Sequence, residues 1–314
     1  MVRVAVCEPA LGRHVRLRAE LLERHPDATF NGGEALLAGD ALVAFLRGHN
    51  YAVVGSQVMD ASVFAAVPEL KVISKWGVGL DSLDLEAMNN FGVRLGWTAG
   101  VNRLSVAELT LSLMISLLRY VPQAGRHVRD GGWQRFIGRH LSGKTVGIIG
   151  CGCIGKEVVR LLVPFGCRVL AHDRLDYAEF YDANGVVALG LDELLGEADV
   201  VSVHVPSDAT TRGLISAERL ARMKPGAILV NTARGGIVDE TALKQRLQDG
   251  GLAAAAFDVF ATEPPNDSEL LSLANFLATP HIGGSAEEAI LAMGRAAIDG
   301  LDNARVPGRG WPKP

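Results

Sequence analysis

Short apolar runs of strand length alternate with helix-length segments along nearly the whole chain. The first hundred residues contain such runs at 2–6, 51–54, 70–73 and 93–97, with a helical pattern at 36–47 between two of them. This alternation is typical of parallel sheets, because parallel strands are joined by a crossover segment that is usually a helix. The sequence therefore predicts an α/β protein built on parallel sheets.

A second series of the same kind begins at Lys144. Its predicted strands cover residues 145–149, 168–171, 200–205, 227–231, 253–257 and 276–278. Several of these strands are almost entirely apolar, as expected when helices cover both faces of a sheet. Two series in 314 residues agree with the usual size of about 150 residues per domain.

Long helices are predicted on either side of the second series. One lies at 105–120, where Ser105 and Glu108 have the spacing of a capping box. A polar, glycine-containing segment follows at 126–143, and a last helix is predicted at 286–303. We expect this last helix to pack on the first domain. The chain would then divide into a discontinuous domain of residues 1–103 and 287–314 and a continuous domain of residues 104–286.

Charge and hydropathy exclude several classes of protein. The net charge of −4 provides no basic excess for a nucleic acid or an anionic membrane surface. The longest apolar stretch, at 104–121, contains Glu108 and Arg119, so we interpret it as a buried helix and not as a membrane span. No secretory leader is recognisable at the start of the sequence, and a cytoplasmic protein is expected.

A glycine-rich loop between a predicted strand and a predicted helix is the strongest single motif. Gly150, Gly152 and Gly155 form the pattern G-x-G-x-x-G directly after the strand at 145–149. In dinucleotide-binding loops these glycines allow a tight turn, a close approach to the pyrophosphate, and close packing of helix and strand. Asp173 follows about 20 residues later, where a carboxylate binds the ribose hydroxyls. A carboxylate at this position would repel a 2′-phosphate, which favours NAD over NADP, although the adjacent Arg174 is a side chain that tolerates the additional phosphate of NADP.

Cysteine usage gives no sign of disulfides or of a metal site. The four cysteines are Cys7, Cys151, Cys153 and Cys167. Four in a chain of this length do not form a disulfide framework, and no second ligand pair at zinc-site spacing accompanies them, so reduced thiols and no metal are predicted. Two of them lie inside the glycine loop. We interpret these as small residues that fill the loop; the alternative is a redox-sensitive thiol, because a helix N-terminus favours the thiolate.

Three ionisable residues follow three predicted strands of the second series. Arg234 comes after the strand at 227–231, Glu263 follows the one at 253–257, and His281 follows the one at 276–278. Ligands of open α/β sheets bind beyond the carboxyl ends of the strands. Arginine binds a carboxylate in a bidentate manner, and histidine transfers protons near neutral pH. Together the three suit oxidation of a hydroxy acid; an ordinary structural role for each is the alternative.

Through these motifs the sequence resembles the D-isomer-specific 2-hydroxyacid dehydrogenase family, in particular its phosphoglycerate-dehydrogenase-like branch. The matching segments are 77–84, 106–110, 150–155 with Asp173, 231–239, 258–265 and 279–284. The resemblance implies two flavodoxin- or Rossmann-like parallel-sheet domains with a cleft between them. Residues 104–286 would form the NAD-binding domain, and the discontinuous domain would bind the substrate. It also implies a homodimer, paired through the NAD-binding domain and the helix at 105–120.

The resemblance also assigns roles to individual residues. His281 would move the proton, Glu263 would hold His281, and Arg234 would bind the substrate carboxylate and carbonyl. Besides the three loop glycines and Asp173, the implied cofactor contacts are Val78, Cys153, Ile154, Val205, Thr232, Asp258 and Gly283. The implied substrate contacts, in addition to Arg234 and His281, are Gly77, Val78, Gly79 and Lys75. For Lys75 the alternative is a solvated surface lysine.

The predicted activity is NAD-dependent interconversion of a small D-2-hydroxy acid and its 2-keto acid. The stretch at 54–57 lacks the basic residue that 3-phosphoglycerate enzymes often have there, so phosphoglycerate is not favoured over other acids. A phosphite- or phosphonate-type anion dehydrogenase is one alternative, supported by Lys75. An NAD-sensing corepressor or scaffold is an alternative of another class, because such proteins keep the fold and the three residues.

Overall fold

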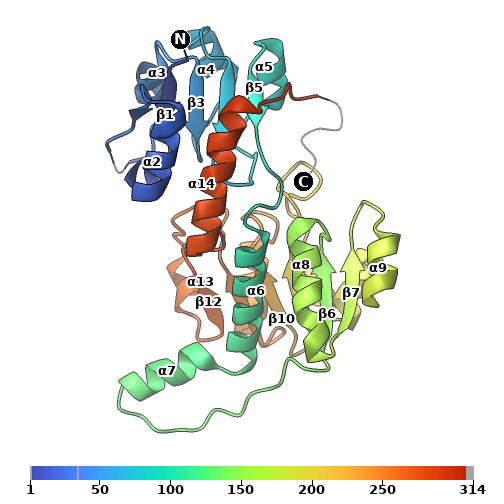
Figure 1. Cartoon of the computed structure of the whole chain (residues 1–314). Coiled ribbons are helices and arrows are strands. Elements are labelled where there is room, and N and C mark those ends of the chain that lie inside the picture. The colour runs from blue at the N-terminus through green and yellow to red at the C-terminus, as the bar shows by residue number, and fades with distance from the viewer. Residues whose placement is uncertain (1, 34, 309–314) are drawn as a thin grey trace. The chain divides into compact units, whose positions relative to one another are not determined.

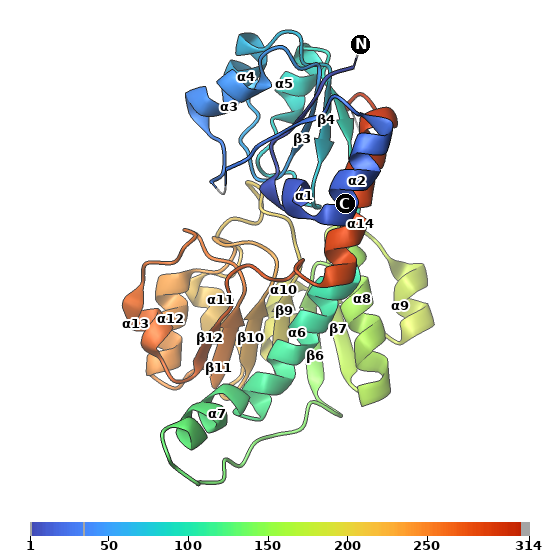
Figure 2. The same cartoon turned by 60° about the vertical axis from the view of Figure 1, so that its left-hand side comes forward.

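The computed structural model describes residues 2–33 and 35–308. The chain forms two compact units (Figures 1 and 2). Residues up to 102 together with those from 285 onward make the first unit, and Arg103–Gly284 makes the second. Each unit contains one parallel sheet with helices on both faces.

The first unit is built on a five-stranded parallel sheet with the order β2-β1-β3-β4-β5. Its strands are β1 (Val4–Val6), β2 (Thr29–Phe30), β3 (Tyr51–Val54), β4 (Val72–Lys75) and β5 (Arg94–Gly96). Its helices are α1 (Pro9–Arg13), α2 (Val15–Arg24), α3 (Gly39–Leu46), α4 (Ala61–Ala66), α5 (Leu85–Asn90) and α14 (Glu287–Asp302). This strand order is that of the flavodoxin-like fold, and its direction reverses between β1 and β3.

Two apolar layers sandwich this sheet. On one face Leu46 of α3, Phe64 of α4 and Met88 of α5 pack against β3 and β4 (Figure 2). On the other face α2 and α14 bury Leu21 and Ile298 against β1 and β3. Burial on both faces explains why the strands are continuous apolar runs in the sequence.

The last helix, α14, lies against β4 and β5 at very close range. A Cβ atom on Gly96 of β5 would overlap the backbone of Gly300 in α14. Beside this contact the Ser74 hydroxyl donates a hydrogen bond of 2.5 Å to the Ala297 carbonyl. Two glycines facing each other therefore let the helix that is last in the chain complete the first unit.

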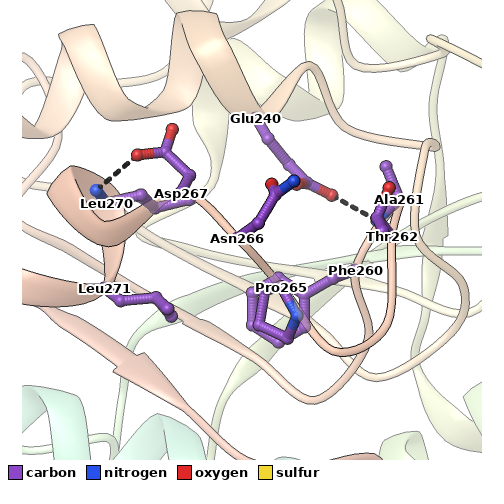
Figure 3. Close-up of a pocket in the computed structure, with 9 residues that line it drawn as sticks. All are labelled: Glu240, Phe260, Ala261, Thr262, Pro265, Asn266, Asp267, Leu270 and Leu271. Atoms are coloured by element: carbon purple, nitrogen blue, oxygen red, sulfur yellow. Dashed lines mark hydrogen bonds between the residues drawn. The ribbon is translucent and has the colours of Figure 1, made fainter.

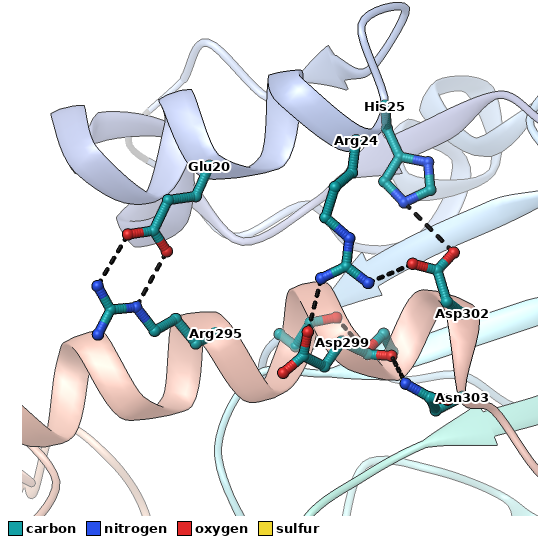
Figure 4. A network of polar contacts seen from close by, with 9 residues as sticks. Glu20, Arg24, His25, Arg295, Asp299, Asp302 and Asn303 are labelled. Atoms are coloured by element: carbon teal, nitrogen blue, oxygen red, sulfur yellow. Dashed lines mark hydrogen bonds and ion pairs between the residues drawn. The ribbon is translucent and has the colours of Figure 1, made fainter.

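Ion pairs join α14 to α2 along the same face (Figure 4). Arg295 donates to both carboxylate oxygens of Glu20, at 3.0 and 2.8 Å, and Arg24 pairs with Asp299 at 2.6 Å and with Asp302. The Arg295 guanidinium lowers the pKa of Glu20 to about 2. The pairs are exposed to solvent, so they define how α14 aligns on α2 more than they stabilise the unit.

A seven-stranded parallel sheet with the order β12-β11-β10-β9-β6-β7-β8 forms the second unit. Its strands are β6 (Thr145–Ile149), β7 (Arg168–His172), β8 (Val187–Ala188), β9 (Val200–Val203), β10 (Ile228–Asn231), β11 (Ala254–Phe257) and β12 (Phe276–Ala278). Its helices are α6 (Arg103–Leu118), α7 (Val121–Arg129), α8 (Cys153–Leu162), α9 (Ala178–Asn184), α10 (Leu191–Glu197), α11 (Ala217–Arg222), α12 (Glu240–Gln248) and α13 (Ser268–Ser272), with a 3₁₀ turn at Val163–Phe165. The order outward from β6 is that of a Rossmann fold extended by one strand, with its switch point between β6 and β9. The predicted fold class, two parallel-sheet α/β units, is confirmed.

Helix α6 departs from the prediction at its N-terminus. It begins at Arg103, so Ser105 lies within its first turn and the predicted capping box is wrong. The Ser105 hydroxyl instead donates to the Gly283 carbonyl at 2.7 Å. The first residues of the polar segment at 126–143 belong to α7, which buries none of its side chains in the unit. In the described ranges 2–33 and 35–308, no single helix is long and apolar enough to span a membrane; α6 and α7 meet these criteria only as a pair bent by 64°.

Candidate active site

Arg234, Glu263 and His281 follow β10, β11 and β12, which are neighbours in the sheet of the second unit. Because the three strands are parallel, the loops that carry these residues leave the sheet at one edge. The structure brings Glu263 and His281 into direct contact, with 2.8 Å between Glu263 Oε2 and His281 Nδ1. Both side chains are accessible to solvent, at 39% and 52% exposure, so the pair is open to a ligand.

The turn that carries His281 is held by the buried carboxylate of Asp258. Its Oδ1 accepts the Thr279 hydroxyl at 2.6 Å and the Ile282 N–H at 2.8 Å, and its Oδ2 accepts the Gly283 N–H at 2.8 Å. The His281 N–H donates to the Asp258 carbonyl at 2.9 Å. His281 has φ +53°, a left-handed conformation that is uncommon for a non-glycine residue and is typical of functional sites. Asp258 therefore orients the histidine, a role that sequence reasoning missed.

Hydrogen bonds from Asn231, the last residue of β10, hold the loop that carries Arg234. This buried amide accepts the Ala233 N–H at 3.1 Å and donates to the Arg234 carbonyl at 2.9 Å. The next residue, Gly235, lies so close to the Phe260 carbonyl that a Cβ atom would overlap it. Phe260 in turn donates its N–H to Glu263 Oε1 at 3.1 Å. The arginine and glutamate loops therefore pack on one another through backbone atoms.

The glycine loop has the geometry expected of a dinucleotide cradle. Gly150 has φ +93°, and a Cβ atom there would lie 2.7 Å from the carbonyl carbon of His204. A Cβ atom on Gly155 would overlap the carbonyl oxygen of Gly150, whereas one on Gly152 would have no described atom within 4 Å. Gly152 is the N-cap of α8, and no side chain in the described part of the protein caps this helix terminus. The first turn of α8 therefore offers N–H groups and open space to an anion such as a pyrophosphate.

Asp173 lies directly beyond β7, beside this loop. Its carboxylate accepts the Cys151 N–H at 2.6 Å and the Leu175 N–H at 2.8 Å, which fixes its position. A cavity of about 270 Å³ adjoins it and is lined in part by Tyr181 and Leu189. The neighbouring Arg174 pairs with Asp208 at 3.5 Å. The residues present fit a nicotinamide dinucleotide, with the glycines at the pyrophosphate and Asp173 at a ribose.

The cysteines of the loop differ in their surroundings. Cys151 is fully buried, and this burial raises the pKa of its thiol to about 11. The burial of Cys151 disfavours its thiolate and therefore argues against the redox-sensitive alternative at this cysteine, because desolvation outweighs the effect of the helix terminus. Cys153 is the first residue of α8 and is half-buried, next to Ile154 in the same turn.

Other predicted cofactor contacts lie on loops of the same sheet edge. Val205 follows β9 and packs on the core, and Gly283 belongs to the turn held by Asp258. The Thr232 hydroxyl, after β10, bonds to the hydroxyl of Thr110 at 2.8 Å, which connects α6 to the arginine loop. Thr110 is fully buried and was another residue that sequence reasoning missed.

The remaining predicted residues belong to the first unit, where Lys75 is the last residue of β4 and residues 77–79 lie in the loop that follows. Gly77 has φ +88°, and the Val78 carbonyl accepts the indole N–H of Trp97 at 3.0 Å, so the loop that continues to Gly79 is ordered by the unit itself. Lys75 is only 7% exposed and donates to the carbonyls of Gly55 and Trp76. The interpretation of Lys75 as a solvated surface lysine is therefore wrong.

A Rossmann sheet with a glycine cradle and an acidic residue after its second strand defines a nicotinamide-dinucleotide-binding protein. Residues 111–283 match the family model of the D-isomer specific 2-hydroxyacid dehydrogenase NAD-binding domain. The chain belongs to the D-isomer-specific 2-hydroxyacid dehydrogenases, a family of oxidoreductases, and to their phosphoglycerate-dehydrogenase-like branch. The predicted family is confirmed.

Two relatives that are named D-3-phosphoglycerate dehydrogenase support this assignment. D-3-phosphoglycerate dehydrogenase of Mycobacterium tuberculosis is 42% identical over 250 residues, which are 79% of this chain and 47% of that protein. The human enzyme of the same name is 40% identical over 256 residues, 81% of this chain and 48% of that protein. The chain thus spans about half the length of these relatives.

Among solved structures, the TT0316 protein of Thermus thermophilus superposes with a TM-score of 0.87 at 35% identity, covering 98% of this chain and 99% of that one. D-lactate dehydrogenase of Aquifex aeolicus, complexed with NAD and lactic acid, gives a TM-score of 0.86 at 25% identity, with the same coverage of 98% and 99%. Both likenesses extend over the whole of the two units.

Proposed function

We propose that this protein interconverts a small D-2-hydroxy acid and its 2-keto acid with NAD as the cofactor. The contact of 2.8 Å between Glu263 Oε2 and His281 Nδ1 carries this proposal. Because Glu263 occupies Nδ1, the other ring nitrogen of His281, Nε2, is left to face a substrate oxygen. A histidine held in this way is a general acid in one direction and a general base in the other.

The other residues bind and orient the substrate. The Arg234 guanidinium, one strand away from Glu263, suits a bidentate interaction with the substrate carboxylate. Main-chain N–H groups of Gly77, Val78 and Gly79 are proposed to bind the same carboxylate. When NAD is bound, its nicotinamide accepts or supplies the hydride. During oxidation, His281 Nε2 takes the hydroxyl proton, and during reduction it returns the proton to the carbonyl oxygen.

Asp173 supports NAD over NADP. Its carboxylate is held in place by two N–H donors and accepts ribose hydroxyls, whereas it repels a 2′-phosphate. We propose that Gly150, Gly152 and Gly155 hold the pyrophosphate. Cys153 and Ile154 contribute backbone contacts at the same helix terminus, and the remaining contacts are proposed for Val78, Val205, Thr232, Asp258 and Gly283.

The substrate is proposed to be a small anionic 2-keto or 2-hydroxy acid. The mycobacterial and human relatives are named for D-3-phosphoglycerate, and the Aquifex aeolicus structure contains lactic acid. Phosphite or phosphonate oxidation was supported by Lys75 alone. Its ammonium group already donates to two backbone carbonyls, and we therefore propose the hydroxy-acid reaction ahead of phosphite or phosphonate oxidation.

A panel of 2-keto acids assayed with NADH and with NADPH tests the proposed function. Glyoxylate, pyruvate, hydroxypyruvate and phosphohydroxypyruvate are offered in turn, and loss of reduced-nicotinamide absorbance is followed. At least one acid is expected to turn over at about 1 s⁻¹ or faster. The rate with NADH should exceed that with NADPH by at least about tenfold, because Asp173 repels the 2′-phosphate. Tight NADH binding without turnover of any acid would favour the scaffold alternative. In a separate assay with phosphite and NAD⁺, formation of NADH would favour the anion dehydrogenase.

A homodimer in the cytoplasm is also proposed, and exposed apolar side chains on the second unit support the dimer. Trp133 and Ile137 are 89% and 93% exposed, and Val121 and Val128 of α7 are 53% and 50% exposed. Apolar surface of this extent on one segment is typical of an interface. Together with α7, the segment at 130–137 is proposed to pack on a second copy of the chain.

The double variant Trp133→Glu/Ile137→Asp is expected to be monomeric, because each charge would be buried unpaired in the interface. The molar mass is measured by size-exclusion chromatography with light scattering. Leu175→Asp is the control, since Leu175 is 52% exposed on the same unit outside this segment. A monomeric wild-type protein, or a double variant that still dimerises, contradicts the proposed interface.

A further inference from the structure

Glu240 connects the loop of Arg234 to the loop of Glu263. It is the first residue of α12, where the arginine loop ends, and its neighbour Asp239 caps this helix by accepting the Ala242 N–H. Glu240 Oε1 does not cap α12 but reaches across to the Ala261 N–H, which donates to it at 2.7 Å (Figure 3). Helix capping is thus already supplied by Asp239, and the Glu240 carboxylate serves a different purpose.

The residues next to Ala261 position the acid–base pair. Phe260, directly before it, donates its N–H to Glu263 Oε1, and the other oxygen of Glu263 contacts His281 Nδ1. In sequence, Ala261 lies between Phe260 and Glu263, the two residues that the first of these hydrogen bonds joins. A carboxylate that holds the Ala261 N–H therefore holds the short turn that aims Glu263 at His281.

The surroundings of Glu240 leave no room for a substrate. It lines a cavity of only about 50 Å³, together with Ala261, Asn266 and Asp267 (Figure 3). This volume accommodates water but no organic acid. Burial raises the pKa of Glu240, so keeping a carboxylate here costs free energy that the bond to Ala261 partly offsets.

We propose that Glu240 is a positioning residue for the hydroxy-acid reaction, acting on His281 through the Ala261 N–H and Glu263. This inference rests on the proposed function, because it assigns Glu240 to the same acid–base pair. Gly235 fastens the same two loops through a separate contact with Phe260, so loss of the Glu240 carboxylate should misplace Glu263 without unfolding the loop.

Three variants separate positioning from simple stabilisation. Glu240→Ala removes the acceptor, and Glu240→Gln keeps a carbonyl oxygen that can accept the Ala261 N–H. Lys244→Ala is the control, because Lys244 joins the same helix to Asp267 and Glu269, at 2.8 and 3.0 Å, without touching the turn at 260–263. Each is assayed with the best acid of the wild-type panel, and hydrogen exchange of the Ala261 amide is measured on the protein without substrate.

For Glu240→Ala, kcat is expected to fall about tenfold while KM and the NADH dissociation constant stay within about twofold, because misplacement of the acid–base pair affects mainly the chemical step. Exchange of the Ala261 amide should accelerate in this variant alone. Glu240→Gln and Lys244→Ala should stay within about twofold of wild type in kcat.

An unchanged kcat in Glu240→Ala overturns the positioning role, as does an equal loss in Lys244→Ala or a loss that Gln does not restore. Amide exchange that is the same in the Ala variant and the wild type contradicts the hydrogen bond itself. These outcomes leave the proposed function intact. A wild-type protein that turns over no acid contradicts the proposed function, and the exchange of the Ala261 amide then still decides whether Glu240 holds the turn at 260–263.

Discussion

His281→Asn is expected to lower kcat about a thousandfold, because positioned general acid–base catalysis contributes about 10² to 10⁴ in rate and an amide does not exchange a proton near neutral pH. Asparagine is the suitable replacement. His281 has φ +53°, and asparagine adopts this left-handed conformation more readily than alanine does. The loss then reports the missing imidazole and not a strained turn, since the Asp258 bonds to the Thr279 hydroxyl and to the Ile282 and Gly283 N–H groups are kept.

Steady-state kinetics with the best acid of the panel measures the loss, and quenching of protein fluorescence by NADH measures cofactor binding. The NADH dissociation constant should stay within about twofold, because His281 binds the substrate and not the pyrophosphate. His140→Asn, at an exposed position outside the site, is the matched control and should keep wild-type kinetics. A kcat for His281→Asn within about tenfold of wild type would exclude His281 as the proton carrier.

The sequence was most informative where strands are buried and where functional residues follow them. Tyr51–Val54 and Thr145–Ile149 were predicted with the bounds that the structure gives, because buried parallel strands appear as apolar runs. The two-residue edge strands Thr29–Phe30 and Val187–Ala188 were missed. Both residues of the second are exposed, so neighbouring strands determine the pairing and no apolar pattern marks it.

Helix boundaries depended on contacts that a local pattern does not contain. Ser105 has the residue type and spacing of an N-cap, yet its hydroxyl bonds to Gly283, which is remote in sequence, and the helix begins two residues earlier. Helix α7 is amphipathic, yet it buries none of its residues in the unit. Its apolar side faces no core within that unit, and the helix was not separated from the polar segment that follows it.

In the candidate active site, the residues that follow the strands could be predicted from the sequence, whereas the residues that hold them in place could not. Parallel topology places the ends of β10, β11 and β12 at one edge, so Arg234, Glu263 and His281 could be selected from their positions after the strands. The groups that hold them could not: Asn231 and Thr110 are ordinary polar residues until the fold brings them to the arginine loop. Lys75 illustrates the reverse case, because only the structure shows that its ammonium group is occupied by backbone carbonyls.

Gly152→Ala and Gly155→Ala are expected to damage the cofactor site in different ways. A Cβ atom on Gly152 has no described protein atom within 4 Å, so Gly152→Ala should lower the free energy of unfolding without cofactor by no more than the loss of an N-cap glycine, about 1 kcal/mol or less. The same methyl group occupies the space through which a pyrophosphate approaches α8. The NADH dissociation constant should therefore rise about 100-fold, equivalent to ~2.7 kcal/mol.

In Gly155→Ala the methyl group would overlap the Gly150 carbonyl oxygen, and the loop must shift to accept it. Forced overpacking costs about 1–3 kcal/mol, so this variant should lose unfolding free energy as well as NADH affinity. Urea unfolding without cofactor and NADH titration measure the two effects. Gly190→Ala is the matched control, because Gly190 is the N-cap of α10 in the same unit and has equal space around its Cβ. Wild-type NADH affinity in Gly152→Ala would contradict binding of the pyrophosphate at the first turn of α8, because the added methyl group would lie in the space that the pyrophosphate must occupy.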